Sequence, residues 1–116
     1  MRDVTLYLKD ILESMNAIEA FVEGMDFKAF MQDLKTRSAV VRQLEVIGEA
    51  AKKVPDPIRR KNPGVAWRQM AGMRDRLVHA YFDVDYAIVW DLIKDVIPAE
   101  KLVIQRIIDD SEASAG

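Results

Sequence analysis

Apolar residues recur along the first half of the chain with the alternating three- and four-residue spacing of an amphipathic α-helix. The first helical stripe consists of Val4, Leu8, Ile11, Met15, Ile18 and Val22. Gly24 is expected to end this helix, and Asp26 can cap the next one. The second stripe consists of Phe27, Met31, Leu34, Val41, Leu44, Ile47, Ala51 and Val54. The pattern therefore predicts two helices, of which the second is long and central.

The second half of the chain returns to helical spacing after an interruption. Pro55-Asp-Pro57 predicts the end of the long helix, because proline lacks an amide donor, and residues 55–64 are expected to form a connector. A helical stripe then runs from Val65 to Ala80, with Trp67 as an expected core anchor. Asp85 can cap a further helix, which Pro98 is expected to kink or restart. Only residues 111–116 are expected to form a loose, flexible tail.

These segments predict an all-α fold. No segment alternates with the period of a strand, and four or five amphipathic helices joined by short loops favour an up-and-down antiparallel helical bundle. A chain of 116 residues is long enough for one hydrophobic core, so residues 1–110 are expected to form a single domain. Because two stripes have a spacing near 3.5 residues, one helical face is available to a second copy, which favours a homodimer.

Composition narrows the chemistry that the chain can perform. The sequence has no cysteine and one histidine, which excludes disulfides and argues against a zinc site within one chain. We therefore expect any catalysis to need neither a metal nor another cofactor. The amino terminus lacks the apolar core of a signal peptide, and no apolar run approaches the ~20 residues of a membrane span. We expect a cytoplasmic protein that does not enter a membrane.

The formal net charge of −2 hides an uneven distribution. Between Lys52 and Arg76 there are eight basic residues and two acidic ones, so this stretch carries +6 and the remainder carries −8. A local band of positive charge can attract a polyanion such as RNA. A solvated basic surface without a ligand is the alternative interpretation. The candidate RNA-binding residues are Arg59, Arg60, Lys61, Arg68 and Arg76.

Residues 74–81 concentrate the side chains that could carry chemistry. Asp75 and His79 are four residues apart on one predicted helix face, so the carboxylate can fix the imidazole tautomer. Arg74 precedes His79 by five residues, and its long side chain can bend toward the same cleft. Attack of an RNA 2′-hydroxyl on the adjacent phosphate needs a proton acceptor, a proton donor and positive charge, which histidine and arginine supply.

A single histidine is an incomplete acid and base pair. A twofold dimer would place two His79 and two Arg74 side chains around one cleft, which gives a chemical reason to expect dimerisation. The alternative is a structural pair of Asp75 and His79 in a helical scaffold, because ion pairs of this kind also occur without catalysis.

The segments LEVIGEAAKK, residues 44–53, and VAWRQMAGMRDRLVHAYF, residues 65–82, resemble the HepT family of the HEPN superfamily. The resemblance extends over nearly the whole chain. The family signature is Arg-x4-His-x-Tyr, which Arg74, His79 and Tyr81 match, with Asp75 at the polar position after the arginine. The resemblance implies a HEPN-like antiparallel bundle, a homodimer with a composite cleft, and metal-independent RNA cleavage by Arg74 and His79.

The resemblance also implies a partner. HepT proteins are usually encoded beside a minimal nucleotidyltransferase that acts as antitoxin, and in some pairs this enzyme transfers AMP to the motif tyrosine, here Tyr81. We therefore expect an endoribonuclease toxin of a type II/VII-like toxin–antitoxin pair. The alternative is a non-catalytic helical dimer that serves as an adaptor or nucleotide-binding partner of the nucleotidyltransferase, and a bare helical scaffold is the third possibility.

Overall fold

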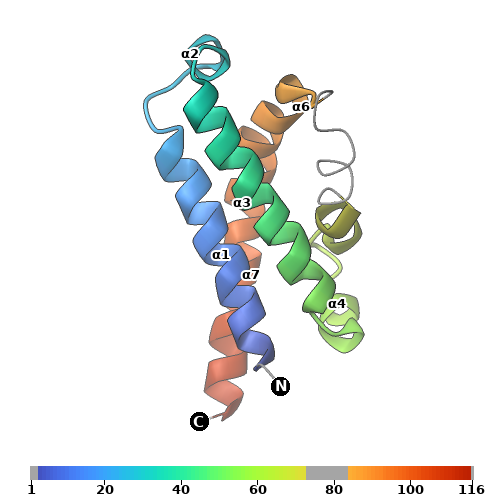
Figure 1. The fold of residues 1–116 in the computed structure, drawn as a ribbon. Coiled ribbons are helices and arrows are strands. Elements are labelled where there is room, and N and C mark those ends of the chain that lie inside the picture. Colours follow the sequence, from blue (N-terminus) through green and yellow to red (C-terminus); the bar gives the residue numbers. More distant parts are fainter. Residues whose placement is uncertain (1–2, 73–83, 116) are drawn as a thin grey trace.

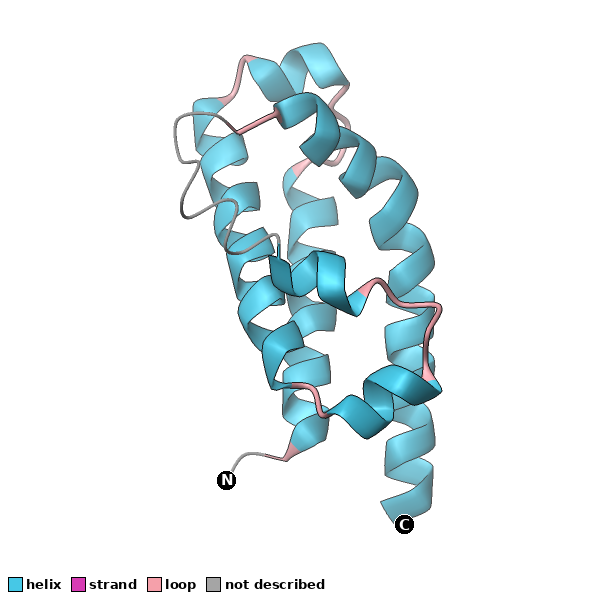
Figure 2. Cartoon of the chain, turned by 90° about the vertical axis from the view of Figure 1, so that its right-hand side faces the viewer, coloured by secondary structure: helices cyan, strands magenta, loops and turns pink. Residues whose placement is uncertain are grey.

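The computed structural model describes residues 3–72 and 84–115, and these residues contain helices and short connections but no strand. This confirms the predicted all-α fold (Figure 2). A short helical segment also covers residues 67–72. The other helical elements are α1 (Val4–Phe21), α2 (Phe27–Met31), α3 (Leu34–Lys53), α4 (Asp56–Lys61), α6 (Tyr86–Asp91), the π-helical η1 (Leu92–Val96) and α7 (Ile97–Ala115).

Three long helical rods form the body of the molecule (Figure 1). α1 packs against both α3 and α7 and runs antiparallel to them, while α6, η1 and α7 follow one another without a break. Two ion pairs report the antiparallel register of α1 and α7: Lys9 with Glu112 at 2.9 Å and Lys101 with Glu19 at 2.6 Å. The short helix α2 lies at one end of the bundle and α4 at the other (Figure 1).

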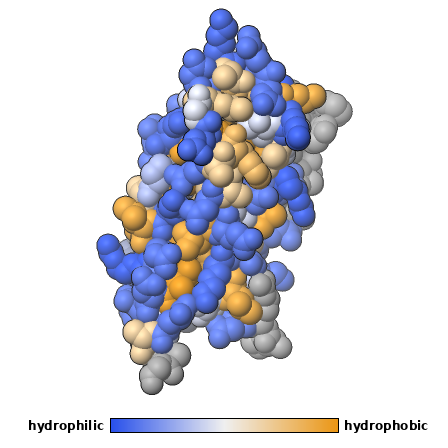
Figure 3. Space-filling model, turned by 90° about the vertical axis from the view of Figure 1, so that its left-hand side faces the viewer, coloured by the Kyte–Doolittle hydropathy of each residue, from blue (hydrophilic) through white to orange (hydrophobic). Residues whose placement is uncertain are grey.

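The core is built from the apolar stripes that the sequence predicts. Their fully buried side chains come mainly from the three long rods and include Leu8, Ile11, Met15, Ile18, Val40, Leu44, Ile97 and Ile104. On the face shown in Figure 3, apolar side chains form a band between rows of polar ones. Among the described residues, no helix combines the length and the hydropathy needed to cross a membrane.

The predicted second helix is wrong in one respect, because the structure divides it into α2 and α3. The Asp33 carboxylate accepts the backbone N–H of Thr36 at 3.0 Å and so begins a new helix. Arg37 donates from its guanidinium to the carbonyls of Phe30 and Met31, the last turn of α2. The predicted cap at the start of α2 is confirmed, since Asp26 accepts the N–H of Ala29 at 2.8 Å.

Three further boundaries differ from the prediction. The expected connector contains α4, because Pro57 lies in the first turn of that helix, where its missing N–H costs nothing. Pro98 lies just after η1, so the chain absorbs the proline in a π-helical turn and does not restart. The predicted tail is helical through Ala115, since no proline or glycine precedes Gly116 there. The predicted homodimer involves a second copy and stays a prediction.

Candidate functional site

The motif residues themselves lie outside the described residues. This applies to Arg74, Asp75, Arg76, His79 and Tyr81, whose roles stay predictions. The structure does describe the chain on both sides of the motif. The helical segment 67–72 ends two residues before Arg74, and α6 begins at Tyr86 with Asp85 as its cap. These flanking segments are the nearest described parts of the chain on either side of the motif.

The segment that leads into the motif is fastened by buried side chains. Val65, Trp67 and Met70 are 3%, 6% and 7% exposed, so each is part of the core. The indole N–H of Trp67 donates to the carbonyl of Asn62 at 3.0 Å, and the Asn62 amide donates to the carbonyl of Ile58 at 2.9 Å. The expected role of Trp67 as a core anchor is confirmed. These contacts attach the chain before the motif to α4 and to the core.

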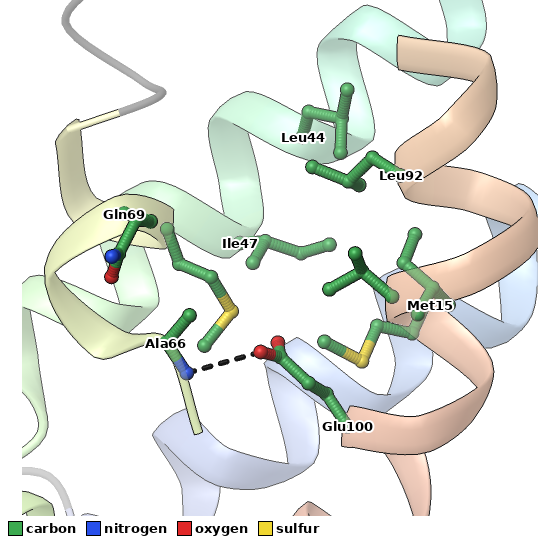
Figure 4. Close-up of a pocket in the computed structure, with 10 residues that line it drawn as sticks. Met15, Leu44, Ile47, Ala66, Gln69, Leu92 and Glu100 are labelled. Carbon is green, nitrogen blue, oxygen red and sulfur yellow. Dashed lines mark hydrogen bonds between the residues drawn. The ribbon is translucent and has the colours of Figure 1, made fainter. Parts of the chain in front are cut away.

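A buried carboxylate from α7 makes a further contact with this segment. Glu100 accepts the backbone N–H of Ala66 at 3.0 Å, with its side chain directed from α7 toward that amide (Figure 4). Glu100 is only 8% exposed. Burial raises the pKa of the Glu100 carboxyl above its ordinary value, while the hydrogen bond from Ala66 opposes the rise.

Sequence reasoning missed Glu100, although a signal for it is present. The residues around it follow a helical stripe in which Ile97 and Ile104 are fully buried, and position 100 falls on the same stripe. A charged residue in an apolar stripe is uncommon, because burying a carboxylate is costly without a partner. The stripe therefore marks Glu100 as a residue to examine.

A small cavity lies beside this hydrogen bond, with a volume of about 50 Å³. α1, α3, the segment 67–72, η1 and α7 all contribute to it (Figure 4). It is lined by Met15, Leu44, Ile47, Ala66, Gln69, Met70, Leu92, Val96, Ile97 and Glu100. Drug-sized ligands occupy pockets of roughly 300 Å³ or more, so this cavity is too small for a nucleotide. It is therefore an internal packing feature next to the Glu100 contact.

A second hollow, of about 230 Å³, lies between α1 and α3 and is open to solvent. Charged side chains of both signs line it, including Asp10, Arg42, Glu49 and Lys53. The mixed charge gives the hollow no clear preference for an anion or a cation. Within residues 3–72 and 84–115, no group of three or more histidine or acidic side chains is arranged to hold a metal ion.

The structure describes residues 52–72 of the predicted basic band, which run from the end of α3 through α4 to the helical segment 67–72 (Figure 1). Over residues 52–72 there are six basic residues and one acidic residue, which gives a local charge of +5. Arg60, Lys61 and Arg68 are exposed, and no ion pair within the described part of the chain holds them. Arg59 differs, because its guanidinium is 2.6 Å from the Asp56 carboxylate and is partly buried.

Comparison with known proteins identifies a family whose model matches most of the chain. The family described as "Ribonuclease HepT-like" matches residues 11–107 of the chain. "Putative RNase MJ1216" of Methanocaldococcus jannaschii is 47% identical over 111 residues, which is 96% of this chain and 92% of that protein. "Probable ribonuclease HepT" of Thermococcus cleftensis is 47% identical over 95 residues, which is 82% of this chain and 86% of that protein. No solved structure matches the chain.

Proposed function

Because the chain belongs to the HepT-like ribonuclease family, we propose that it is a metal-independent endoribonuclease toxin in which Arg74 and His79 carry the reaction. One observation supports this most strongly: relatives named as ribonucleases align with nearly the whole chain, which keeps Arg74, His79 and Tyr81 at the signature spacing. Burial of Val65, Trp67 and Met70 adds support, because it anchors the segment before the motif in the core. We place the activity in the cytoplasm.

The reaction follows from the chemistry of the two side chains. The 2′-hydroxyl oxygen attacks the adjacent phosphorus, and the bond from phosphorus to the 5′-oxygen breaks. His79 accepts the hydroxyl proton as general base, and the second His79 of a dimer donates a proton to the leaving oxygen. The Arg74 guanidinium offsets the added negative charge on the phosphoryl oxygens, and Asp75 orients the imidazole. The products carry a 2′,3′-cyclic phosphate and a 5′-hydroxyl.

This mechanism requires a homodimer, because each chain has one histidine. In the proposed dimer, the two Arg74-to-Tyr81 segments face one cleft across the twofold axis. Light scattering at micromolar concentration tests the dimer directly. A monomer that cleaves RNA would rule out the composite cleft.

The basic surface formed by Arg60, Lys61 and Arg68 is the part of the described chain best suited to hold RNA. These side chains are exposed and are not engaged by acidic neighbours among the described residues, so their charge is available to phosphates. Arg59 is a weaker candidate, because Asp56 already neutralises it. Arg76 remains a candidate on sequence grounds.

We further propose that a minimal nucleotidyltransferase antitoxin silences the toxin by transferring AMP to Tyr81. The tyrosine oxygen would bond to the α-phosphorus of ATP, and pyrophosphate would leave. The added anionic group beside the cleft would oppose RNA by charge and by size.

The experiment is incubation of total RNA with purified protein in the presence of a metal chelator, comparing wild type with His79→Ala. Cleavage by wild type alone, with 2′,3′-cyclic phosphate ends, supports the proposed enzyme. If both proteins leave RNA intact but bind the nucleotidyltransferase, the adaptor function replaces it. Loss of cleavage in wild type on adding chelator would contradict metal independence.

A further inference from the structure

Glu100 is the single charged side chain among the buried residues of the described chain. It lies on α7 in a stripe whose other members are isoleucines, and the cavity around it is almost entirely apolar. A methionine or leucine at this position would bury apolar surface without the cost of desolvating a carboxylate. The core alone therefore gives no reason for a glutamate here.

The contact that Glu100 makes does give such a reason. Ala66 accepts the N–H of Met70 at 2.9 Å and so occupies the cap position of the helical segment 67–72. The first amides of a helix have no partner within it, and alanine has no side chain that can cap them. A cap side chain would accept from the second or third amide of the segment, whereas Glu100 provides an acceptor from a different helix for another of these amides, that of Ala66 itself. It also places negative charge at the positive end of the segment.

Beyond Met70, the described end of the segment is only partly buried, although Ala71 still packs against the core. Ala71 and Gly72 are half-buried, and a Cβ atom built on Gly72 would have no described atom within 4 Å. Met70, which is 7% exposed, is the last buried residue of the described segment, and it lines the same small cavity as Glu100. Apolar packing holds Met70 in the core but has no preferred direction. A hydrogen bond has one, so the contact between Glu100 and Ala66 also restrains the orientation of the segment.

We propose that Glu100 is a positioning residue for the cleavage reaction: it ties the start of the segment 67–72 to α7 and thereby sets the direction in which the chain continues to Arg74. This inference rests on the proposed ribonuclease function. Glu100 acts through the Ala66 amide and touches no reacting atom. A small rotation of the segment would misplace a side chain further along it, and misplacement by about 1 Å can cost on the order of 100-fold in rate.

Three variants test this role of the hydrogen bond between the Ala66 amide and Glu100, which we call the tether. Glu100→Gln keeps an oxygen acceptor of nearly the same shape, whereas Glu100→Met keeps the length and packing but removes the acceptor. Asp33→Ala is the matched control, because it removes a capping acceptor at the start of α3, at the α2 end of the bundle. The measurements are amide hydrogen exchange of the peptide covering residues 64–72, and turnover and KM for a short RNA well below every melting temperature.

We expect Glu100→Met to speed exchange in the peptide 64–72 and to lower turnover about ten-fold or more with little change in KM. Glu100→Gln should keep the wild-type exchange rate and the wild-type turnover. Asp33→Ala should melt earlier but cleave RNA normally. Unchanged exchange in Glu100→Met would overturn the proposal, as would an equal loss of turnover in Asp33→Ala.

The two proposals fail in different ways. If wild type does not cleave RNA, the ribonuclease function fails, and with it the positioning role, while the exchange data still report whether the tether exists. If Glu100→Met does not fold, Glu100→Leu replaces it: faster exchange in Glu100→Leu than in Glu100→Gln supports an acceptor role, and equal exchange in the two variants refutes it.

Discussion

The salt dependence of RNA binding can be predicted from the basic surface, which consists of Arg60, Lys61 and Arg68. All three side chains are exposed and unpaired among the described residues, so each can neutralise one phosphate. Each neutralised phosphate of a single strand contributes about 0.7 to the slope of log affinity against log salt, so three contribute about 2. Raising salt from about 50 to about 200 mM should then weaken wild type about 16-fold more than the triple glutamine variant.

The assay is fluorescence anisotropy of a labelled short RNA, in a His79→Ala background that prevents cleavage. The control carries Lys28→Gln, Lys35→Gln and Arg106→Gln, which are exposed positions outside the basic surface and change the net charge equally. This control should keep the wild-type slope. Equal slopes in the control and the triple variant would show a general charge effect, and an unchanged slope in the triple variant would show that these side chains do not contact RNA.

Three further predictions concern stability and regulation. Phe30→Ala should destabilise the protein by about 3–5 kcal/mol in urea unfolding, because the ring is fully buried and lies 5.0 Å from the Trp90 ring; a loss below about 1 kcal/mol would contradict this packing. Because burial raises the pKa of Glu100 in the folded state, the contribution of Glu100 to stability should fall as the pH rises from the ordinary glutamate pKa through the raised one. No other described residue that lines its cavity titrates. Glu100→Gln should abolish this fall, so parallel pH curves for the two proteins would refute it. Tyr81→Phe should still cleave RNA but gain no AMP mass when incubated with the nucleotidyltransferase and ATP; a gain of AMP would place the modification on another residue.

The core could be predicted from sequence because the helical stripes are regular. The break between α2 and α3 could not, since residues 27–47 contain no proline or glycine and the apolar spacing continues through the break. Met31 and Leu34 belong to that stripe but are 40% and 67% exposed. Docking of Phe30 against Trp90, together with the Asp33 cap, determines the break, and both depend on tertiary structure.

In the candidate site, too, some residues could be predicted from the sequence and others could not. Arg74, His79 and Tyr81 are recognisable from their spacing, because reactive residue types at fixed intervals form a signature. Glu100 has no such signature, since a glutamate on a helix is usually solvated. Its contact joins residues 34 positions apart, and only the fold brings them together. The engagement of Arg59 by Asp56 likewise depends on the short helix α4, which two prolines had argued against.

The central claim is that His79 takes part in RNA cleavage, and its most direct test is the cleavage rate of His79→Ala relative to wild type. The rates are measured with saturating protein and a chelator, at a temperature below both melting transitions. We expect the variant to remain folded and to cleave about 10²- to 10⁴-fold more slowly, the usual contribution of a general acid or base. An equal rate, accompanied only by earlier melting, would show that His79 is structural and would contradict the account.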